Sequence, residues 1–160
     1  MYWSGRTPAD RLDDIALLRT RMGTDAPTAG LDPDSTPWDA ARVAHWDERL
    51  ESSPRVLITA AVEHAPTRRL AAFAELSVPP EPTRPVEQQD TLVLSEHRGR
   101  RLGMLAKAAN LVRLQRDHPG HPSVTTFNAE ENRHMLSVNE AGGFVAVDYE
   151  GARRKTFETP

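Results

Sequence analysis

The chain contains no cysteine among its 160 residues. Disulfide bonds, thiolate metal sites and a cysteine nucleophile are therefore excluded. No apolar run approaches the ~18–20 residues of a transmembrane helix, and the first residues lack the pattern of a secretory signal peptide. From these absences we expect a soluble protein of the cytoplasm that does not interact with membranes.

Neither sign of charge is in large excess, because 23 acidic residues face 20 basic ones and the net charge is −3. This balance gives no support for a nucleic acid or an anionic membrane as partner. His118 and His121 lie in one proline-containing loop without a third ligand nearby, so no metal site is predicted. The length suits a single domain over residues 1–160 that can bury a substantial core.

The order of the predicted elements is mixed α and β. Residues 1–5 allow only a short first strand, and helices are expected near residues 8–22 and 37–50, after Thr-Pro start signals. Residues 55–63 and 70–78 predict a β-hairpin, followed by a stiff proline-rich loop over residues 79–85. Further strands are expected at residues 123–127, 144–149 and 155–158. A strand-helix-strand crossover in the second half predicts one parallel pair.

The stretch DTLVLSEHRGRRLGM, residues 90–104, reads as a strand that feeds a helix through a glycine-containing loop. In that helix the apolar residues Met104, Leu105, Ala108, Leu111 and Val112 share one face, with Lys107, Asn110 and Arg113 on the other. Such a loop aims several backbone N–H groups and the positive end of the helix dipole at one point, which favours a bound phosphate. Arg98, Arg100 and Arg101 add positive charge there.

The segment HRGRRLG resembles the pyrophosphate-binding loop of the GNAT acyltransferase superfamily, whose pattern is Gln/Arg-x-x-Gly-x-Gly/Ala. Arg98 opens the motif and Gly103 closes it, whereas Arg101 stands where the first glycine is expected. The downstream run TTFNAEENRHMLSVNEAGGF resembles the fifth strand and fourth helix of the same superfamily. Together the two motifs make residues 55–157 similar to a GNAT domain, in particular to the C-terminal domain of tandem GNAT proteins.

This resemblance implies the α/β (α+β) GNAT fold, with a mixed central sheet, splayed fourth and fifth strands and about four helices. It also implies that acetyl-CoA binds in the opening between those strands. The pyrophosphate-binding residues would be Arg98, Gly99, Arg100, Arg101, Leu102, Gly103 and Met104. The backbone of Leu92, Val93 and Leu94 would hold the pantetheine arm and polarise the thioester carbonyl.

Two asparagines are further candidates for contact with coenzyme A. Asn132 precedes Phe144 by twelve residues, the spacing at which family members place an asparagine on the pantetheine arm. Asn128 can cap the following helix or contact the ligand, and both roles stay open.

For catalysis, the resemblance directs attention to Asn139, Asp90 and Glu87. Many family members carry a tyrosine that acts as the general acid five residues before the Phe of the Gly-Phe ending. In this chain that Phe is Phe144, and the position five residues before it is Asn139. An asparagine cannot act as a general acid, although it can donate a hydrogen bond to sulfur. Asp90 and Glu87 are candidate bases; in a regular strand their spacing puts them on opposite faces, and Asp90 lies nearer the expected catalytic bend.

The resemblance therefore implies an N-acetyltransferase that passes an acetyl group directly from acetyl-CoA to a primary amine of a small molecule or peptide. The alternative is a GNAT-like domain that binds acyl-CoA or a protein partner without catalysis. A homodimer, the identity of the acceptor and the length of the acyl group all stay open.

Overall fold

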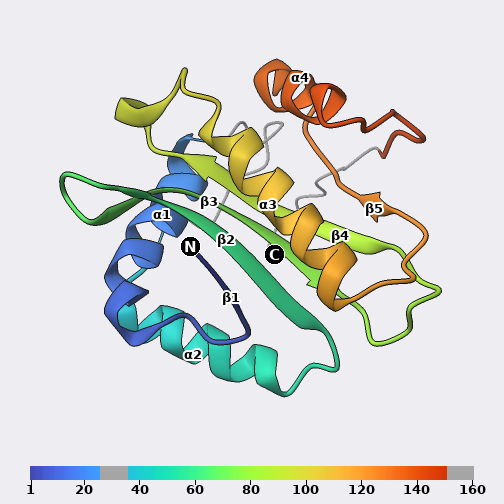
Figure 1. Ribbon diagram of the computed structural model, residues 1–160. Helices are drawn as coiled ribbons and strands as arrows, with labels where there is room; N and C mark the ends of the chain where they lie inside the picture. The colour runs from blue at the N-terminus through green and yellow to red at the C-terminus, as the bar shows by residue number, and fades with distance from the viewer. Residues whose placement is uncertain (26–35, 151–160) are drawn as a thin grey trace, which may run out of the picture.

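The fold is known from a computed structural model that describes residues 1–25 and 36–150. These residues form a five-stranded sheet with helices on both faces (Figure 1). The strands are β1 (Tyr2–Ser4), β2 (Val56–His64), β3 (Arg69–Val78), β4 (Val86–Val93) and β5 (Val124–Thr125). The α-helices are α1 (Leu12–Asp25), α2 (Ala40–Glu51), α3 (Leu102–Asp117) and α4 (Arg133–Ala141), and short 3-10 helices η1 (Ala9–Arg11) and η2 (Ser95–His97) precede α1 and α3.

The strands lie in sequence order, β1-β2-β3-β4-β5. The first four pair antiparallel, and β5 pairs parallel with β4. The predicted hairpin of β2 and β3 and the predicted parallel pair are both confirmed. β1 contains only three residues, as its sequence suggested.

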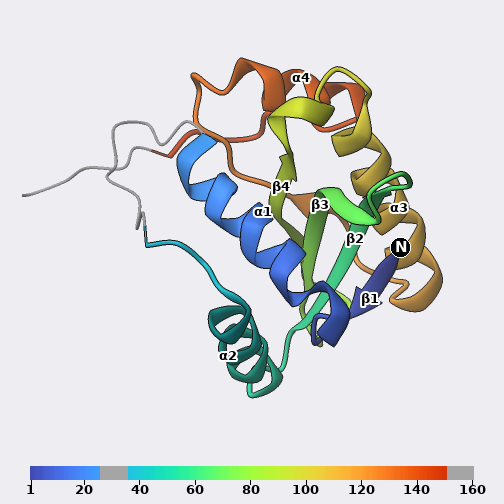
Figure 2. The ribbon, with the colours of Figure 1, turned by 90° about the vertical axis from the view of Figure 1, so that its left-hand side faces the viewer.

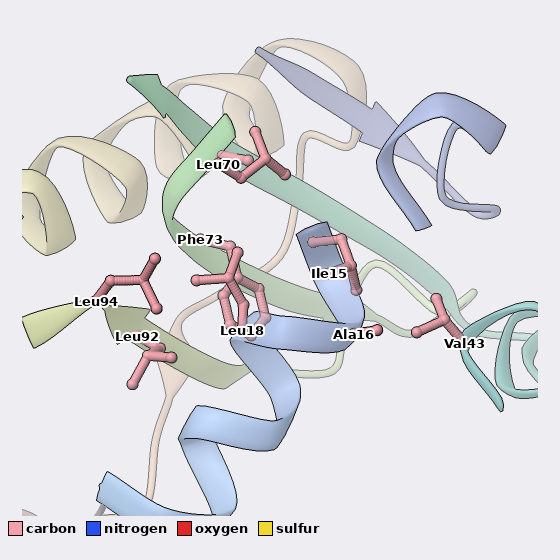
Figure 3. Packing of buried hydrophobic residues seen from close by; sticks show 9 residues of the cluster. Ile15, Ala16, Leu18, Val43, Leu70, Phe73, Leu92 and Leu94 are labelled. Atoms are coloured by element: carbon pink, nitrogen blue, oxygen red, sulfur yellow. The ribbon is translucent and has the colours of Figure 1, made fainter. Parts of the chain in front are cut away.

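The helices divide between the two faces of the sheet. Helices α1 and α2 cover one face and α3 covers the other (Figure 2). The larger core cluster lies under α1, where Phe73 of β3 is fully buried (Figure 3). Its members are Ile15, Ala16, Leu18, Val43, Ala61, Leu70, Phe73, Leu92 and Leu94. We call these two sides of the sheet the α1 face and the α3 face.

The orientation of α3 differs from the prediction. Leu105 and Val112 are 56% and 70% exposed, whereas the buried side of the helix consists of Gly103, Ala106, Lys107, Asn110 and Leu114. The sheet opposite α3 presents the small residues Ala60 and Ala74, which form a cluster with Ala106. Close approach to this surface favours small residues, and Asn110 Nδ2 donates to the Ala74 carbonyl at 2.8 Å. Packing therefore overrides the hydrophobic periodicity.

The end of the described chain also departs from expectation. The segment 144–149 alternates apolar and polar residues but forms no strand, because no described strand pairs with it. Helix α4 begins at Arg133 with Asn132 as its N-cap, so the alternative role of Asn128 as the cap is wrong. The strand predicted at residues 155–158 lies outside the described residues.

Two kinds of feature are absent from the described ranges. No helix within residues 1–25 and 36–150 is long and apolar enough to cross a membrane. The same residues contain no group of three or more His, Cys, Asp or Glu side chains that could hold a metal ion. His121 Nδ1 instead lies 2.8 Å from the Arg84 carbonyl oxygen and ties its loop to the proline-rich segment.

Candidate functional site

Strands β4 and β5 pair over only a short length. Their register joins Val86 to Val124 and Glu87 to Thr125, after which β5 ends while β4 continues to Val93. The edge of β4 that faces β5 is therefore unpaired over most of its length. Helices α3 and α4 lie next to each other near this end of the sheet (Figures 1 and 2).

The backbone of Val93 is directed toward that unpaired edge. The Leu94 N–H donates to the Ala71 carbonyl of β3 at 3.0 Å. Because backbone groups of successive strand residues point to opposite sides, the N–H and carbonyl of Val93 point away from β3. The Val93 carbonyl in fact accepts from Arg98 Nε at 3.1 Å. Of the three strand residues implied by the resemblance, Val93 is thus the one whose backbone faces the opening, while the side chains of Leu92 and Leu94 lie in the core.

The loop that follows β4 turns sharply into α3. Gly99 has a φ of 77° and Arg101, the residue before the helix, has a φ of 58°. Both conformations are left-handed, which explains why glycine is expected at the Arg101 position. No side chain caps the N-terminus of α3. The N–H groups of its first turn are therefore available to an anion, which the helix dipole would also attract.

The three arginines of the loop have different roles. Arg98 is tied to the protein, since its Nη2 contacts Asp25 at 2.9 Å and its Nε contacts Val93. Arg100 and Arg101 are exposed, and neither has a hydrogen-bonding or ionic partner within the described residues. Exposure of Arg101 leaves the N-terminus of α3 uncovered. The charge of these two arginines can be directed to a ligand.

Gly103 is required for packing. A Cβ at Gly103 would lie 3.5 Å from a methyl group of Val93 and 3.7 Å from the methyl group of Thr91. The glycine thus allows the first turn of α3 to pack against β4, because a side chain at this position would point at the strand. A larger side chain at Gly103 would disturb this contact before it reached a ligand on the loop.

Asp90 and Glu87 lie on the same side of the sheet. The β3–β4 register shifts between Ala74 and Leu76, which places an extra residue in β4. Gln88 and Thr91 consequently share the α3 face, where Gln88 Nε2 donates to Thr91 Oγ1 at 3.4 Å. Asp90 contacts Arg19 of α1, and Glu87 pairs with Ser77 in the register, so the two carboxylates lie toward the α1 face. The expected opposite orientation is wrong because the strand is bulged.

A buried ion pair lies beneath Asp90, and the sequence interpretation missed it. Arg19 Nη2 donates to both oxygens of Glu75, at 2.8 and 3.0 Å, and Arg19 Nη1 lies 3.4 Å from Asp90 Oδ2. Burial raises the pKa of Glu75 to about 7, although the Arg19 charge opposes this shift. A glutamate inside the mostly apolar strand LAAFAELSV was the signal that could have revealed it.

The candidate asparagines of the C-terminal half occupy distinct environments. The Asn132 side chain caps α4 by accepting from the Met135 N–H at 3.2 Å, and Asn128 lies in the connection before it. Asn139 is buried and accepts a hydrogen bond of 2.5 Å from Lys107 Nζ. Lys107 was expected on the solvent side of its helix, so the sequence gave no indication of this contact.

Comparisons with known proteins give a consistent result at the level of fold. No protein-family model matches the sequence, and no curated protein matches it. A tandem GNAT protein from the clavulanic acid biosynthesis pathway is 27% identical with a TM-score of 0.72, over 89% of this chain and 40% of that one. The chain thus spans less than half the length of that protein.

Two further solved structures are similar over nearly their whole length. A Trypanosoma brucei acetyltransferase is 18% identical with a TM-score of 0.67, covering 97% of this chain and 100% of that one. AAC(6′)-Iy, solved with the bisubstrate analogue CoA-S-monomethyl-acetylneamine, is 18% identical with a TM-score of 0.63, covering 98% and 99%. The mixed sheet, the parallel β4–β5 pair and the four α-helices match these proteins. By this architecture and this likeness, the chain has the fold of the GNAT acetyltransferases.

Proposed function

We propose that the chain is an acetyl-CoA-dependent N-acetyltransferase that transfers an acetyl group to a primary amine of a small molecule or peptide. The observation that carries this proposal is the uncapped N-terminus of α3 beside the unpaired edge of β4. A left-handed turn, free N–H groups and two arginines that have no partner among the described residues suit a diphosphate. The acetyltransferases of similar fold support the acyl-transfer class.

On the donor side, the loop from Arg98 to Met104 would bind the pyrophosphate of the co-substrate. The N–H of Val93 faces the unpaired edge and would donate to the pantetheine arm or to the thioester carbonyl. Asn132 and Asn128 precede α4 and would contact the same arm from the other side of the opening. Holding both substrates in one orientation supplies much of the rate enhancement in such a direct transfer.

On the acceptor side, Asp90 is the proposed base. Its side chain is partly exposed, lies on the α1 face and contacts only one arm of the Arg19 guanidinium. Glu87 is instead held by Arg55, whose Nη2 lies 3.1 Å from its carboxylate, near the start of β4. Asp90 is therefore the better placed of the two to receive the proton that the attacking amine loses.

The direct test is release of the coenzyme A thiol from acetyl-CoA across a panel of primary amines. Amine-dependent release is expected from the wild type. The double variant Arg100→Glu, Arg101→Glu should raise the KM for acetyl-CoA at least about tenfold, because two attractive charges become repulsive beside the pyrophosphate. Arg84→Glu is the matched control, since Arg84 is exposed and precedes the opposite end of β4. Equal KM values for both variants would contradict the assignment of the loop.

A second candidate function is binding of acyl-CoA without catalysis. Asn139, a residue that cannot donate a proton as an acid, stands where the family commonly has a tyrosine, and this favours the alternative. Calorimetry with acetyl-CoA, run beside the amine panel, separates the two functions. Binding with no amine-dependent release from any amine would favour the second candidate.

A further inference from the structure

Lys107 is a buried cation that has no carboxylate partner among the residues that the structure describes. Its residue is 3% exposed, and its described contacts are the Asn139 side chain and the ring of Phe144, 5.3 Å from Nζ. Buried lysines are rare unless their charge is paired. In the described part of the chain, its bond to Asn139 joins α4 to α3, in addition to the Asn132 cap at the start of α4.

The choice of lysine at this position is itself informative. The chain contains 20 lysines and arginines, of which only Lys107 and Lys155 are lysines. A buried lysine can lose its proton, whereas an arginine stays charged in a protein. Burial lowers the pKa of Lys107 to about 8, and no charged group contributes to this shift. Its ammonium group can therefore donate a proton near neutral pH.

The position of Lys107 places it across the sheet from Asp90. Lys107 follows Gly103 by one turn on the buried side of α3, and Gly103 lies against Thr91 and Val93 of β4. Asp90 lies on the α1 face of the same strand, in contact with Arg19. Lys107 and Asp90 thus belong to opposite faces of the sheet, on either side of the strand whose edge is unpaired beyond β5.

We propose that Lys107 donates a proton to the departing coenzyme A thiolate. This inference rests on the proposed function. The amine nitrogen forms a bond to the acyl carbon and the carbon–sulfur bond breaks, leaving its electron pair on sulfur. The sulfur takes a proton from Lys107 Nζ, and the proton lost by the amine passes to Asp90. Solvent then returns one proton to Lys107 and removes one from Asp90, so that the products are an amide and a free thiol.

Asn139 is the positioning residue for this donor. Its Oδ1 accepts from Lys107 Nζ at 2.5 Å and fixes the direction of the ammonium group. An amide oxygen does not itself carry a transferable proton. Lys107 is therefore the proton donor, and Asn139 only orients it. A simple cysteine thiol has a pKa near 8.5, so a donor with a pKa of about 8 is closely matched to a thiolate leaving group.

The test compares two donors in the wild type and in Lys107→Met, a variant of similar length that removes the proton. One donor is acetyl-CoA and the other is an acetyl thioester of an acidic aromatic thiol, which leaves without protonation. With acetyl-CoA, kcat should fall about 100-fold or more, with little change in KM. With the aromatic thioester, kcat/KM should change less than about threefold. Lys107→Arg should lose kcat with acetyl-CoA as well, because arginine keeps the charge but cannot release the proton.

Two controls keep the outcomes distinct. Gln115→Met, at an exposed position of α3, should leave both donors unaffected. A wild-type kcat that falls above about pH 8, and a Lys107→Met kcat without this fall, would further support the proton donor. Equal losses with both donors, or no loss with acetyl-CoA, would overturn the role of Lys107 alone. Absence of amine-dependent thiol release from the wild type would overturn the proposed function and this inference together.

Discussion

At the scale of single residues, the Arg19–Glu75 pair couples the acceptor side to pH. Glu75 is buried under α1, and its one cationic partner among the described residues, Arg19, is shared with Asp90. When Glu75 is protonated, Arg19 interacts more strongly with Asp90; when Glu75 is ionised, the guanidinium is divided between two carboxylates. The charge on Glu75 therefore decides how the guanidinium of Arg19 is shared with Asp90.

We predict that Glu75 makes the protein less stable as the pH rises from about 4.5 to about 7. Its pKa is raised to about 7 in the folded protein from the ordinary glutamate value of 4.5, so the folded state binds more protons in this window. The free energy of unfolding should fall there by on the order of 3 kcal/mol. Urea titrations at several pH values should show this slope in the wild type. If the free energy of unfolding of Glu75→Gln falls with pH at the same slope, the raised pKa does not belong to Glu75.

The left-handed backbone of Arg101 leads to a second prediction. Its φ of 58° disfavours a residue with a side chain, so Arg101→Gly should stabilise the protein by up to about 1 kcal/mol. Gly99→Ala, at a φ of 77° with open space around the new Cβ, should destabilise it by a similar amount. Chemical denaturation measures both. A destabilised Arg101→Gly would mean that the arginine side chain supports the loop.

At the scale of elements, α3 shows how packing can reverse a hydrophobic pattern. The apolar positions Leu105 and Val112 face solvent, while Asn110 and Lys107 face the protein and find hydrogen-bond acceptors there. We expect Val112→Lys to change the free energy of unfolding by less than about 0.5 kcal/mol. Leu114→Ala, on the buried side, should cost about 2–3 kcal/mol. The reverse ranking in denaturant titrations would contradict the orientation of the helix.

The N-terminus of α4 allows capping to be separated from ligand binding. Asn132→Ala removes the side-chain oxygen that accepts from Met135 and should cost about 1 kcal/mol. Asn132→Asp keeps an oxygen at this position and should retain the cap. If the Asn132 amide also contacts the pantetheine arm, Asn132→Asp should still weaken acetyl-CoA binding in calorimetry. Unchanged affinity in this variant would restrict Asn132 to its structural role.

The elements that the sequence could predict are those whose pattern is local. The β2–β3 hairpin, the proline-rich connection and the glycine-containing turn into α3 follow from neighbouring residues, and all three are present. The bulge in β4 could not be predicted, because it depends on how β4 pairs with β3. The Arg19–Glu75 and Lys107–Asn139 contacts join residues 56 and 32 positions apart. Only the tertiary structure brings them together.

At the scale of the whole molecule, the homodimer stays a prediction. Val145, Val147 and Tyr149 are exposed in the single described chain, as is Val112 on α3. Analytical ultracentrifugation over a range of concentrations would determine the oligomeric state. A monomer that persists at high concentration would contradict the homodimer and leave the donor and acceptor sides within one copy.

The proposed function depends most on acetyl-CoA binding at the loop between β4 and α3, and thermal unfolding tests this binding directly. At a hundredfold excess over Kd, a ligand that binds only the folded state stabilises it by about 2.7 kcal/mol. For a chain of this length we predict a rise in Tm of roughly 5–10 °C. The rise should be absent with an unrelated adenine dinucleotide and reduced in the Arg100→Glu, Arg101→Glu variant. No shift of the wild type at millimolar acetyl-CoA would contradict the account.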